Sequence, residues 1–538
     1  MPTFPKKSWP GQVELELGLD DADDEVALRA AVARKLSVRE ADLPRLVLRR
    51  RTLDSRRGRP RFHLLLQLLA AGEEETPDAL GQQSRLREVG PSHPVVIVGA
   101  GPAGLLCAYE LARHGIGSVV VDRGKMVQPR RRDLKGLNRL GKVDPDSNYC
   151  FGEGGAGTYS DGKLYTRSDK RGNVRDVLET LVRHGAPSEI LVDARPHIGS
   201  NRLPKVVTAL REQLQQVGVQ FRFEQRVTRL LIEQHAGQRV VAGVGFADGT
   251  EIAAQYVVLA TGHSARDVVQ LLLDAGERIE PKAFALGVRI EHPQPLINQI
   301  QYGRFVDHPK LPAAAYRLAS TVGTSKVFSF CMCPGGFVVP AMTEPGSIVV
   351  NGMSLSKRNS PYANSGLVVG IEPEQFASAG FHGVTGGIQL QESVEQAAFL
   401  AGDAMLRAPA TRVVDFMAGR GSSTVPKSSY IPGLVATDIA EVLSAARLEL
   451  HRHLKRALSD FARSMPQYLS EEAVLIGVES RTSSPIRVHR DPQTAMSTRI
   501  LGLFPCGEGA GHAGGIISAA LDGVRVASSI AQLSGSTG

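Results

Sequence analysis

The alternation of apolar and polar side chains predicts a small module before residue 90. Residues 13–18 (VELELG) alternate in the manner of a half-buried strand. Residues 25–36 have apolar side chains at helical spacing after an acidic start, which suits a helix N-terminus. Strand-like runs at 46–53 and 60–69 flank the turn-like sequence DSRRGRP. We therefore expect residues 1–90 to form a β-α-β-β module that ends in a polar linker.

A strand, turn, helix and strand follow the linker in PVVIVGAGPAGLLCAYELARHGIGSVVVDRG. Apolar strands are expected at 95–98 and 118–121, on either side of a helix over 105–114. The turn before the helix has the spacing G-x-G-x-x-G, and an acid ends the second strand. The candidate contacts are Gly99, Gly101, Pro102, Ala103, Gly104 and Asp122.

This turn has the chemistry of a dinucleotide site. The first glycine allows the tight turn, the second lets the backbone approach a pyrophosphate, and the third lets the helix pack on the sheet. Backbone amides and the positive end of the helix dipole then hold the phosphates. Asp122 is placed to accept hydrogen bonds from an adenosine ribose. NAD and FAD share this pattern, so it does not choose between them.

Two later glycine turns also follow apolar strands. YVVLATGHSA ends a strand at Thr261 and Gly262, after the hairpin-like strand RVTRLLIEQ, which begins near the further candidate Val227. LFPCGEGAGHAGGIISAALDGVRVA reads as a short strand, a turn and a helix. The candidates in this last element are Gly507, Glu508, Gly514, Gly515 and Ile516.

With these elements the chain resembles the two-dinucleotide-binding-domain flavoproteins. In that superfamily the A-T-G turn lies beside FAD, an acid after the last strand holds the ribityl or pyrophosphate portion, and the final helix starts at the flavin. Glu508 stands where an Asp is more usual. No second strand-GxGxxG-helix unit is present for a nicotinamide coenzyme, although NAD(P)H could bind transiently as an electron donor.

Longer motifs narrow the resemblance to one group within this superfamily. FGEGGAGTYSDGKL, RPHIGSNRLPKVV, FALGVRIEHPQ, FSFCMCPGGFVVPA and GVESRTSSPIR are similar to those of a large group of bacterial and plastid FAD-dependent dehydrogenases of unassigned activity. The resemblance implies an α/β fold with a Rossmann-like FAD-binding domain of the glutathione-reductase type. It also implies an inserted β-rich substrate domain and a small N-terminal α+β module. The expected FAD-domain parts are 91–275 and 479–538, with the substrate domain over 276–478.

The sequence CFGEGGAGTYSDGKL, residues 150–164, is interpreted as a second cofactor-contacting loop. It lacks the G-x-x-x-x-G-K-[ST] order of a P-loop. Backbone amides at Gly154, Gly155 and Gly157 could approach the cofactor closely. Arg123 and the arginines at 130–132 are expected to supply positive charge to the diphosphate or adenine side. The last basic residue, Lys163, is expected beyond the loop, where it holds the loop or faces substrate.

Four residues are candidates for catalysis. His263 and His512 lie in turns expected near the flavin, where a histidine could transfer a proton or simply bind the backbone. Alternation along a strand would place Glu479 and Arg481 on one polar face, either as a salt bridge at the domain junction or as the lining of a substrate pocket.

The cysteines leave two alternatives open. Five cysteines argue against a disulfide framework, and the pair Cys331 and Cys333 has no second Cys or His pair at zinc spacing, so no metal site is expected. The pair could be ordinary buried thiols or a redox dithiol that exchanges electrons with the flavin.

The distribution of charge along the chain favours a competing hypothesis about its partners. The net charge of +8 favours anionic partners, which could be a phosphorylated cofactor or nucleic acid. Eight arginines crowd the N-terminal module and could bind RNA or form a solvated or interdomain face. They are Arg45, Arg49, Arg50, Arg51, Arg56, Arg57, Arg59 and Arg61. Aromatic residues, at 5%, are too few to suggest stacking platforms for single strands.

The sequence therefore predicts a FAD-dependent oxidoreductase, with hydride transfer between a small organic substrate and flavin N5 as its chemistry. The alternative is an RNA-associated flavoprotein, or one that uses FAD as a structural or sensing ligand. No apolar run has the length of a signal-peptide core or a membrane span, so we expect a cytoplasmic protein without a membrane partner.

Overall fold

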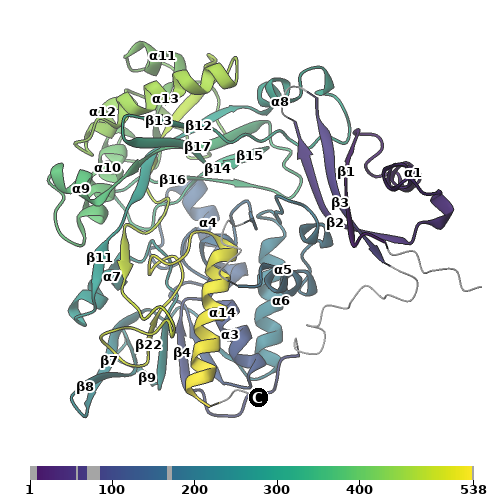
Figure 1. The fold of residues 1–538 in the computed structure, drawn as a ribbon. Helices are drawn as coiled ribbons and strands as arrows, with labels where there is room; N and C mark the ends of the chain where they lie inside the picture. Colours follow the sequence, from purple (N-terminus) through teal and green to yellow (C-terminus); the bar gives the residue numbers. More distant parts are fainter. Residues whose placement is uncertain (1–8, 56–58, 70–84, 166–171, 536–538) are drawn as a thin grey trace, which may run out of the picture.

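A parallel five-stranded sheet lies in the lower half of the molecule in Figure 1. The computed structural model describes residues 9–55, 59–69, 85–165 and 172–535. The sheet has the order β22-β10-β4-β5-β6, and each neighbouring pair is parallel. Its strands are β4 (Val95–Val98), β5 (Ser118–Val121), β6 (Gln220–Arg222), β10 (Tyr256–Leu259) and β22 (Leu503–Pro505).

Helices cover one face of this sheet and a second sheet covers the other. Val95 and Ile97 pack towards the helices, whereas Val96 and Val98 pack towards the second sheet, which is why this strand is apolar throughout. The helices are α3 (Pro102–Arg113), α5 (Val174–Arg183), α6 (Leu203–Gln216) and α14 (Ile516–Leu533). The second sheet is antiparallel and contains β7 (Val227–His235), β8 (Gln238–Phe246) and β9 (Glu251–Ala253). We refer to these layers as the parallel-sheet domain.

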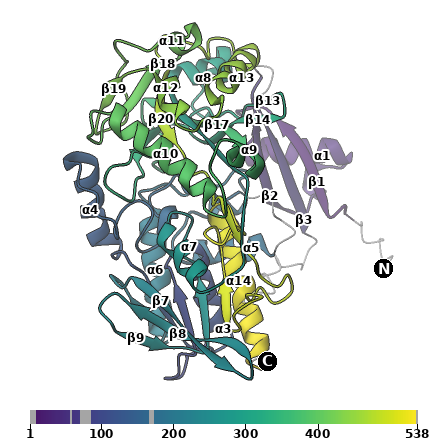
Figure 2. The ribbon, with the colours of Figure 1, turned by 90° about the vertical axis from the view of Figure 1, so that its left-hand side faces the viewer.

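An inserted domain lies above the parallel-sheet domain in Figures 1 and 2. Its main sheet has seven strands in the order β13-β14-β17-β12-β20-β18-β19. These strands are β12 (Phe284–Pro293), β13 (Ala319–Val322), β14 (Ser325–Cys333), β17 (Tyr362–Ile371), β18 (Ala408–Arg412), β19 (Leu434–Ala436) and β20 (Val474–Glu479). A two-stranded sheet of β15 (Gly336–Pro340) and β16 (Val350–Ser354) lies beside it.

The segments in which the chain leaves and re-enters the parallel-sheet domain lie side by side. They contain β11 (Ile279–Pro281) and β21 (Ile486–Val488), which pair antiparallel. The remaining described α-helices of these two domains are α4 (Val127–Leu140), α7 (Arg266–Asp274), α8 (Gln294–Tyr302), α9 (Pro373–Ser378), α10 (Gly386–Ala401), α11 (Val413–Ala418), α12 (Ile439–Ser444) and α13 (Leu450–Ser464). The sequence-based expectation of a Rossmann-like α/β fold is confirmed.

The N-terminal module projects on the right of Figure 1 and has the expected β-α-β-β order. It consists of β1 (Gln12–Leu17), α1 (Glu25–Leu36), β2 (Arg45–Asp54) and β3 (Arg61–Leu69), with the sheet order β1-β3-β2. Two main-chain hydrogen bonds dock β2 on the parallel-sheet domain: Arg51 N donates to Val192 O (2.8 Å) and Ala194 N donates to Arg51 O (2.9 Å).

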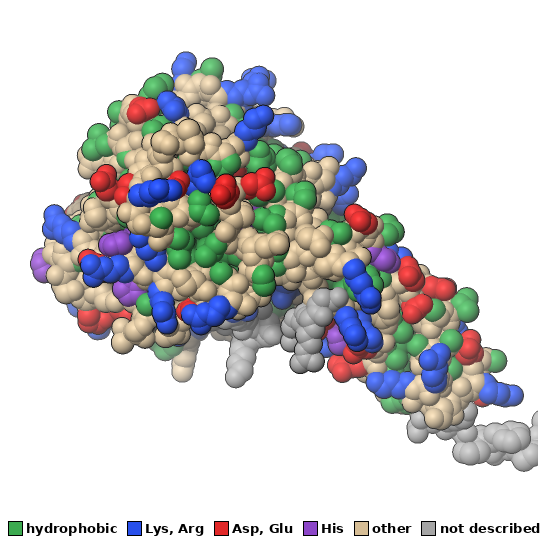
Figure 3. All heavy atoms as spheres, turned by 90° about the horizontal axis from the view of Figure 1, so that it is seen from above, with side chains coloured by type: hydrophobic (Ala, Val, Ile, Leu, Met, Phe, Trp, Pro, Cys, Tyr) green, Lys and Arg blue, Asp and Glu red, His purple; other side chains and the backbone are tan. Residues whose placement is uncertain are grey.

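Several arginines of this module form ion pairs with acidic side chains of the same chain. Arg50 contacts Glu14, Arg61 contacts Glu16, and Arg51 contacts both Asp23 and Asp193. Figure 3 shows basic and acidic side chains interleaved on the module. The arginines at 56 and 57 lie outside the described residues.

Among the described residues, α14 alone is long and apolar enough to cross a membrane. About two thirds of it (67%) is buried in the protein, where it packs along α3, as expected of a core helix.

Candidate functional site

The three glycine turns predicted from the sequence meet at the carboxyl ends of adjacent parallel strands. Ala260 N donates to Val98 O (2.8 Å), and Cys506 N donates to Leu259 O (3.0 Å), so each turn is tied to the next strand. Gly99 has a φ of +108°, and a Cβ there would lie 2.4 Å from Ala260 O. Only glycine allows the first two turns to approach this closely. Open α/β sheets bind ligands at this edge.

The loop at 150–164 crosses between the starts of α3 and α14. Gly154 N donates to Ala100 O (2.8 Å), and a Cβ on Gly155 would lie only 3.0 Å from Gly101 Cα. A Cβ on Gly157 would lie 3.3 Å from Ile516 at the start of α14. The structure therefore brings this loop together with the first and last glycine turns, although their sequences lie far apart.

The backbone around these turns fits a dinucleotide. The N-cap residues of α3 and α14 are Gly101 and Gly515, which provide no capping side chain, so first-turn amides remain to bind an anionic group. Gly262, Gly514 and Gly515 have no atom within 4 Å of an added Cβ, which leaves room for a cofactor against the main chain. A cavity beside the A-T-G turn is lined by Thr261, His263, Ser484, Pro505 and Gly509, among others.

Asp122 supports the first turn directly. Its two carboxylate oxygens accept hydrogen bonds from Ala100 N and Gly124 N, each at 2.8 Å. Val227 begins β7 with its side chain buried between the two sheets, so a cofactor contact there would involve its main chain. Pro102 and Ala103 form the first turn of α3.

Two of the four arginines expected to supply positive charge, Arg123 and Arg130, are already paired within the chain, which corrects the expectation for these two. Arg123 donates to Asp146 (2.7 Å) and Asp267 (3.0 Å). Arg130 is fully buried, and burial lowers the pKa of its guanidinium. Its guanidinium donates to four main-chain carbonyls of the glycine-rich loop region, at Asn148, Tyr149, Glu153 and Gly155. Arg130 thus supports the loop from behind, because four of its five N–H donors bind main-chain carbonyls and the side chain is fully buried.

An Arg130→Met variant should lose about 3 kcal/mol of stability and bind FAD less tightly, since several buried carbonyls lose their donors at once. Chemical denaturation and FAD titration of the variant measure the two effects. Arg131→Met is the matched control, because the side chain of Arg131 is exposed on the same helix and should be replaceable at little cost. Equal stability of both variants would contradict this role for Arg130.

Both candidate histidines are fixed by main-chain carbonyls. His512 Nε2 lies 2.9 Å from Val488 O, and burial lowers the pKa of its imidazole to about 4. His263 Nε2 lies 3.0 Å from Arg481 O, and its Nδ1 lies 3.6 Å from Glu508 Oε2. At neutral pH the imidazole of His512 is therefore uncharged. Glu508 faces His263 across the site.

Sequence reasoning missed an acid that holds the last turn. Asp522, in α14, accepts a hydrogen bond from Gly507 N at 2.7 Å and forms an ion pair with Arg490. Its one sequence signal was an acid within the otherwise apolar run IISAALDGV.

Glu479 and Arg481 do not pair with each other, which corrects the expected shared face. β20 ends at Glu479, so strand alternation does not extend to Arg481. Glu479 forms a fully buried ion pair with Arg289 of β12, while Arg481 binds Glu395 of α10 through two nitrogens, at 3.1 and 2.9 Å. Burial raises the pKa of Glu479 to about 7 although Arg289 opposes the shift.

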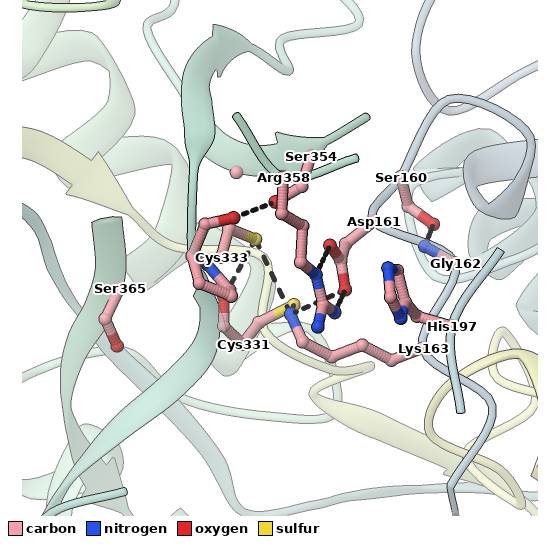
Figure 4. A network of polar contacts seen from close by, with 12 residues as sticks. Ser160, Asp161, Gly162, Lys163, His197, Cys331, Cys333, Ser354, Arg358 and Ser365 are labelled. Carbon is pink, nitrogen blue, oxygen red and sulfur yellow. Dashed lines mark hydrogen bonds and ion pairs between the residues drawn. The ribbon is translucent and has the colours of Figure 1, made fainter. Parts of the chain in front are cut away.

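Lys163 reaches from the glycine-rich loop into the inserted domain. Its ammonium lies 3.5 Å from each of the sulfur atoms of Cys331 and Cys333 (Figure 4). It thereby joins the loop to β14, a contact between domains that no local sequence pattern indicated. Within the described residues no group of three or more His, Cys, Asp or Glu side chains could hold a metal ion.

Comparison with known families agrees with this geometry. Residues 92–134 match the family described as FAD binding domain, and 197–316 match FAD dependent oxidoreductase. Residues 283–482 match the family described as FAD-dependent protein, C-terminal domain-like. Residues 10–68 match a domain of unknown function.

Solved structures that match the chain include tetracycline destructase Tet(51), with 13% identity, a TM-score of 0.34, and coverage of 82% of this chain and 83% of that one. Another is a flavoprotein/dehydrogenase from Cytophaga hutchinsonii, with 12% identity, a TM-score of 0.33, and coverage of 82% and 79%.

A relative from Clostridium beijerinckii, called an uncharacterized protein, is 38% identical over 536 residues, which is 96% of this chain and 97% of that protein. FAD is the cofactor that the matched domains share. The chain belongs to this family of uncharacterised FAD-dependent oxidoreductases.

Proposed function

We propose that the chain is a dehydrogenase that transfers a hydride between a small organic substrate and FAD. The supporting observation is the start of α14, which has no capping side chain and follows the open backbone of Gly514 and Gly515. A helix N-terminus favours a group that carries negative charge. FAD supplies the two-electron chemistry when bound. The amides of Gly101 and the first turn of α3 would hold its phosphates.

His512 would accept the proton that an alcohol or amine loses when its hydride leaves. Its imidazole is neutral at pH 7 and would take the proton as a weaker base than an ordinary histidine, because its pKa is lowered to about 4; Val488 O fixes the ring. His263, held between Arg481 O and Glu508, is the second candidate for proton transfer. The buried partners of Glu479 and Arg481 favour positioning roles for both residues.

We expect the purified chain to contain FAD and to lose its visible flavin absorbance when an organic hydride donor is added without oxygen. Alcohols, amines and 2-hydroxy acids are the first classes to test, with NADH and NADPH in parallel. A His512→Gln variant should keep its FAD but be reduced about 100-fold more slowly, the typical size of a lost general base.

His382→Gln is the matched control, because His382 is exposed in the inserted domain. Equal reduction rates for the two variants would remove His512 from the mechanism. Reduction by NAD(P)H alone, followed by oxygen consumption, would contradict the dehydrogenase proposal. A colourless chain that cannot be reconstituted with FAD would contradict cofactor use itself.

RNA binding by the N-terminal module and a cytoplasmic location stay predictions. Arg49 donates to Gln67 and Arg51 to Asp193, so part of the arginine charge is already used within the chain. A salt-sensitive shift of structured RNA by the full chain would support the RNA prediction. No shift at low salt would exclude it.

A further inference from the structure

The end of β14 turns two cysteines towards one lysine. Pairing with β17 is irregular between Phe330 and Cys333, and Cys331 has a φ of +44°. This irregularity falls at Cys331, and the pairing resumes at Cys333, opposite Asn364. Figure 4 shows the side chains of Cys331 and Cys333 beside the ammonium of Lys163, which comes from the glycine-rich loop. Cations beside a thiol favour its thiolate form, the form that reacts as a nucleophile.

The charge of Lys163 is firmly held. Burial opposes its ionisation, but the two sulfur atoms and Asp161 outweigh burial and raise its pKa. Asp161 Oδ2 lies 3.5 Å from the ammonium, and Arg358 holds that carboxylate through a 2.7 Å contact. Lys163 therefore remains a cation throughout the pH range in which thiols titrate.

The two cysteines differ in environment. Cys331 is partly exposed, whereas Cys333 is fully buried. A hydrogen bond from Cys333, together with Lys163, lowers the pKa of Cys331, while the same hydrogen bond and burial raise the pKa of Cys333. A thiolate on a partly exposed residue, next to a buried thiol that keeps its proton, matches the roles of an attacking and a resolving cysteine.

Other charged and titratable groups surround the pair from several elements. They are Asp161, His197, Arg289, Tyr316, Arg358 and Glu479. Arg289 Nη2 lies 3.8 Å from Cys333 Sγ and donates to Cys331 O at 2.8 Å. A second cation thus lies at the buried cysteine, where a negative charge must develop when that thiol reacts.

We propose that Cys331 and Cys333 form a thiol–disulfide exchange site whose ligand is a small disulfide. The Cys331 thiolate attacks one sulfur of the ligand, forms a mixed disulfide and releases the first thiolate. The Cys333 thiol then gives up its proton, which a leaving thiolate takes, and its sulfur attacks Cys331 Sγ. The second ligand thiolate leaves. The ligand disulfide gains two electrons and becomes one thiol, which carries the proton of Cys333, and one thiolate, which takes a proton from solvent. The cysteine pair becomes a disulfide. This site is independent of the hydride transfer proposed above.

The test is the reaction of the reduced, FAD-loaded full chain with 4,4′-dithiodipyridine without oxygen, followed by thiopyridone absorbance and peptide masses. A Cys150→Ser background removes the other partly exposed thiol. We expect a fast phase that releases two thiopyridones per chain and leaves a disulfide between residues 331 and 333. Cys333→Ser should release one and keep a mixed disulfide on Cys331. Cys331→Ser should lose the fast phase.

Lys163→Met should slow the fast phase at least about tenfold near pH 7, since the thiolate fraction falls tenfold for each unit of pKa. Lys326→Met is the control, because Lys326 is exposed on the same strand and should leave the rate unchanged. Should Lys163→Met fail to fold, the pH dependence of the fast-phase rate in the unsubstituted chain tests the site instead. A fast phase that persists well below pH 8.5 supports the site, and an ordinary thiol profile overturns it. A fast phase that survives in Cys331→Ser also overturns it.

Discussion

A Gly104→Ala variant should lose most of its FAD. A Cβ at this position would lie 1.9 Å from Gly99 O and 3.2 Å from a methyl group of Ile97. The nearer atom belongs to the main chain of the first glycine turn, so α3 or the turn must move to make room. Movement of either shifts the amides expected to bind the phosphates. We expect FAD affinity to fall at least about tenfold, which is about 1.4 kcal/mol, measured by titration of the apoprotein.

Gly136→Ala provides the matched control. Gly136 lies inside α4, and an added Cβ there would meet no atom within 4 Å. Because alanine is the better helix former, this variant should keep its FAD and gain up to about 1 kcal/mol of stability. Equal FAD affinity in the two variants would show that close packing at Gly104 is unimportant for the cofactor.

Local patterns were enough to predict the parallel-sheet domain. The strands expected at 95–98 and 118–121 match β4 and β5, because buried parallel strands are short continuous apolar runs. The helix expected from Leu105 begins earlier, at Pro102, because the last residues of the G-x-G-x-x-G turn are already helical. Proline is well suited to the first helical position, a signal that the periodicity alone did not use.

Partners that lie far apart in the sequence could not be predicted. Lys163 meets Cys331 across 168 residues, and no spacing rule connects a glycine-rich loop to a strand of another domain. Arg130 was expected to face the cofactor because it is basic, yet it binds the carbonyls behind the loop. The sequence identified chemically capable residues, but the packing of the two domains decides which groups neutralise them.

An Arg481→Met variant should be less stable by about 3 kcal/mol. Arg481 and Glu395 are both buried, and Arg481 also donates to Thr343 Oγ1 at 2.7 Å. Removal of one partner leaves a buried carboxylate with less compensation, and breaking buried pairs costs about 3–5 kcal/mol. We expect the lower end of this range for Arg481→Met, because Arg266 still contacts Glu395 at 2.9 Å. Denaturation curves and FAD content measure the loss.

Two further variants separate the charge effect from the loss of packing. Arg463→Met removes an exposed arginine that pairs with Asp460, and it should change stability by less than about 1 kcal/mol. Replacing Arg481 by Met and Glu395 by Gln together should restore much of the stability lost in the single variant, since no uncompensated carboxylate then remains. A single variant with unchanged stability and FAD content but slower turnover would instead favour a place in the substrate pocket.

The pH dependence of stability provides an independent check of the ion pair between Arg481 and Glu395. Burial opposes ionisation of Glu395, but Arg481 and Arg266 hold its pKa at about 2, below the ordinary value of 4.5. A carboxylate whose pKa is depressed by folding stabilises the protein fully above pH 4.5 and loses that contribution as the pH falls towards 2. The stability difference between the unsubstituted chain and Arg481→Met should therefore be largest near neutral pH and shrink in acid. A difference that stays constant with pH would mean that Arg481 acts through packing and not through its charge.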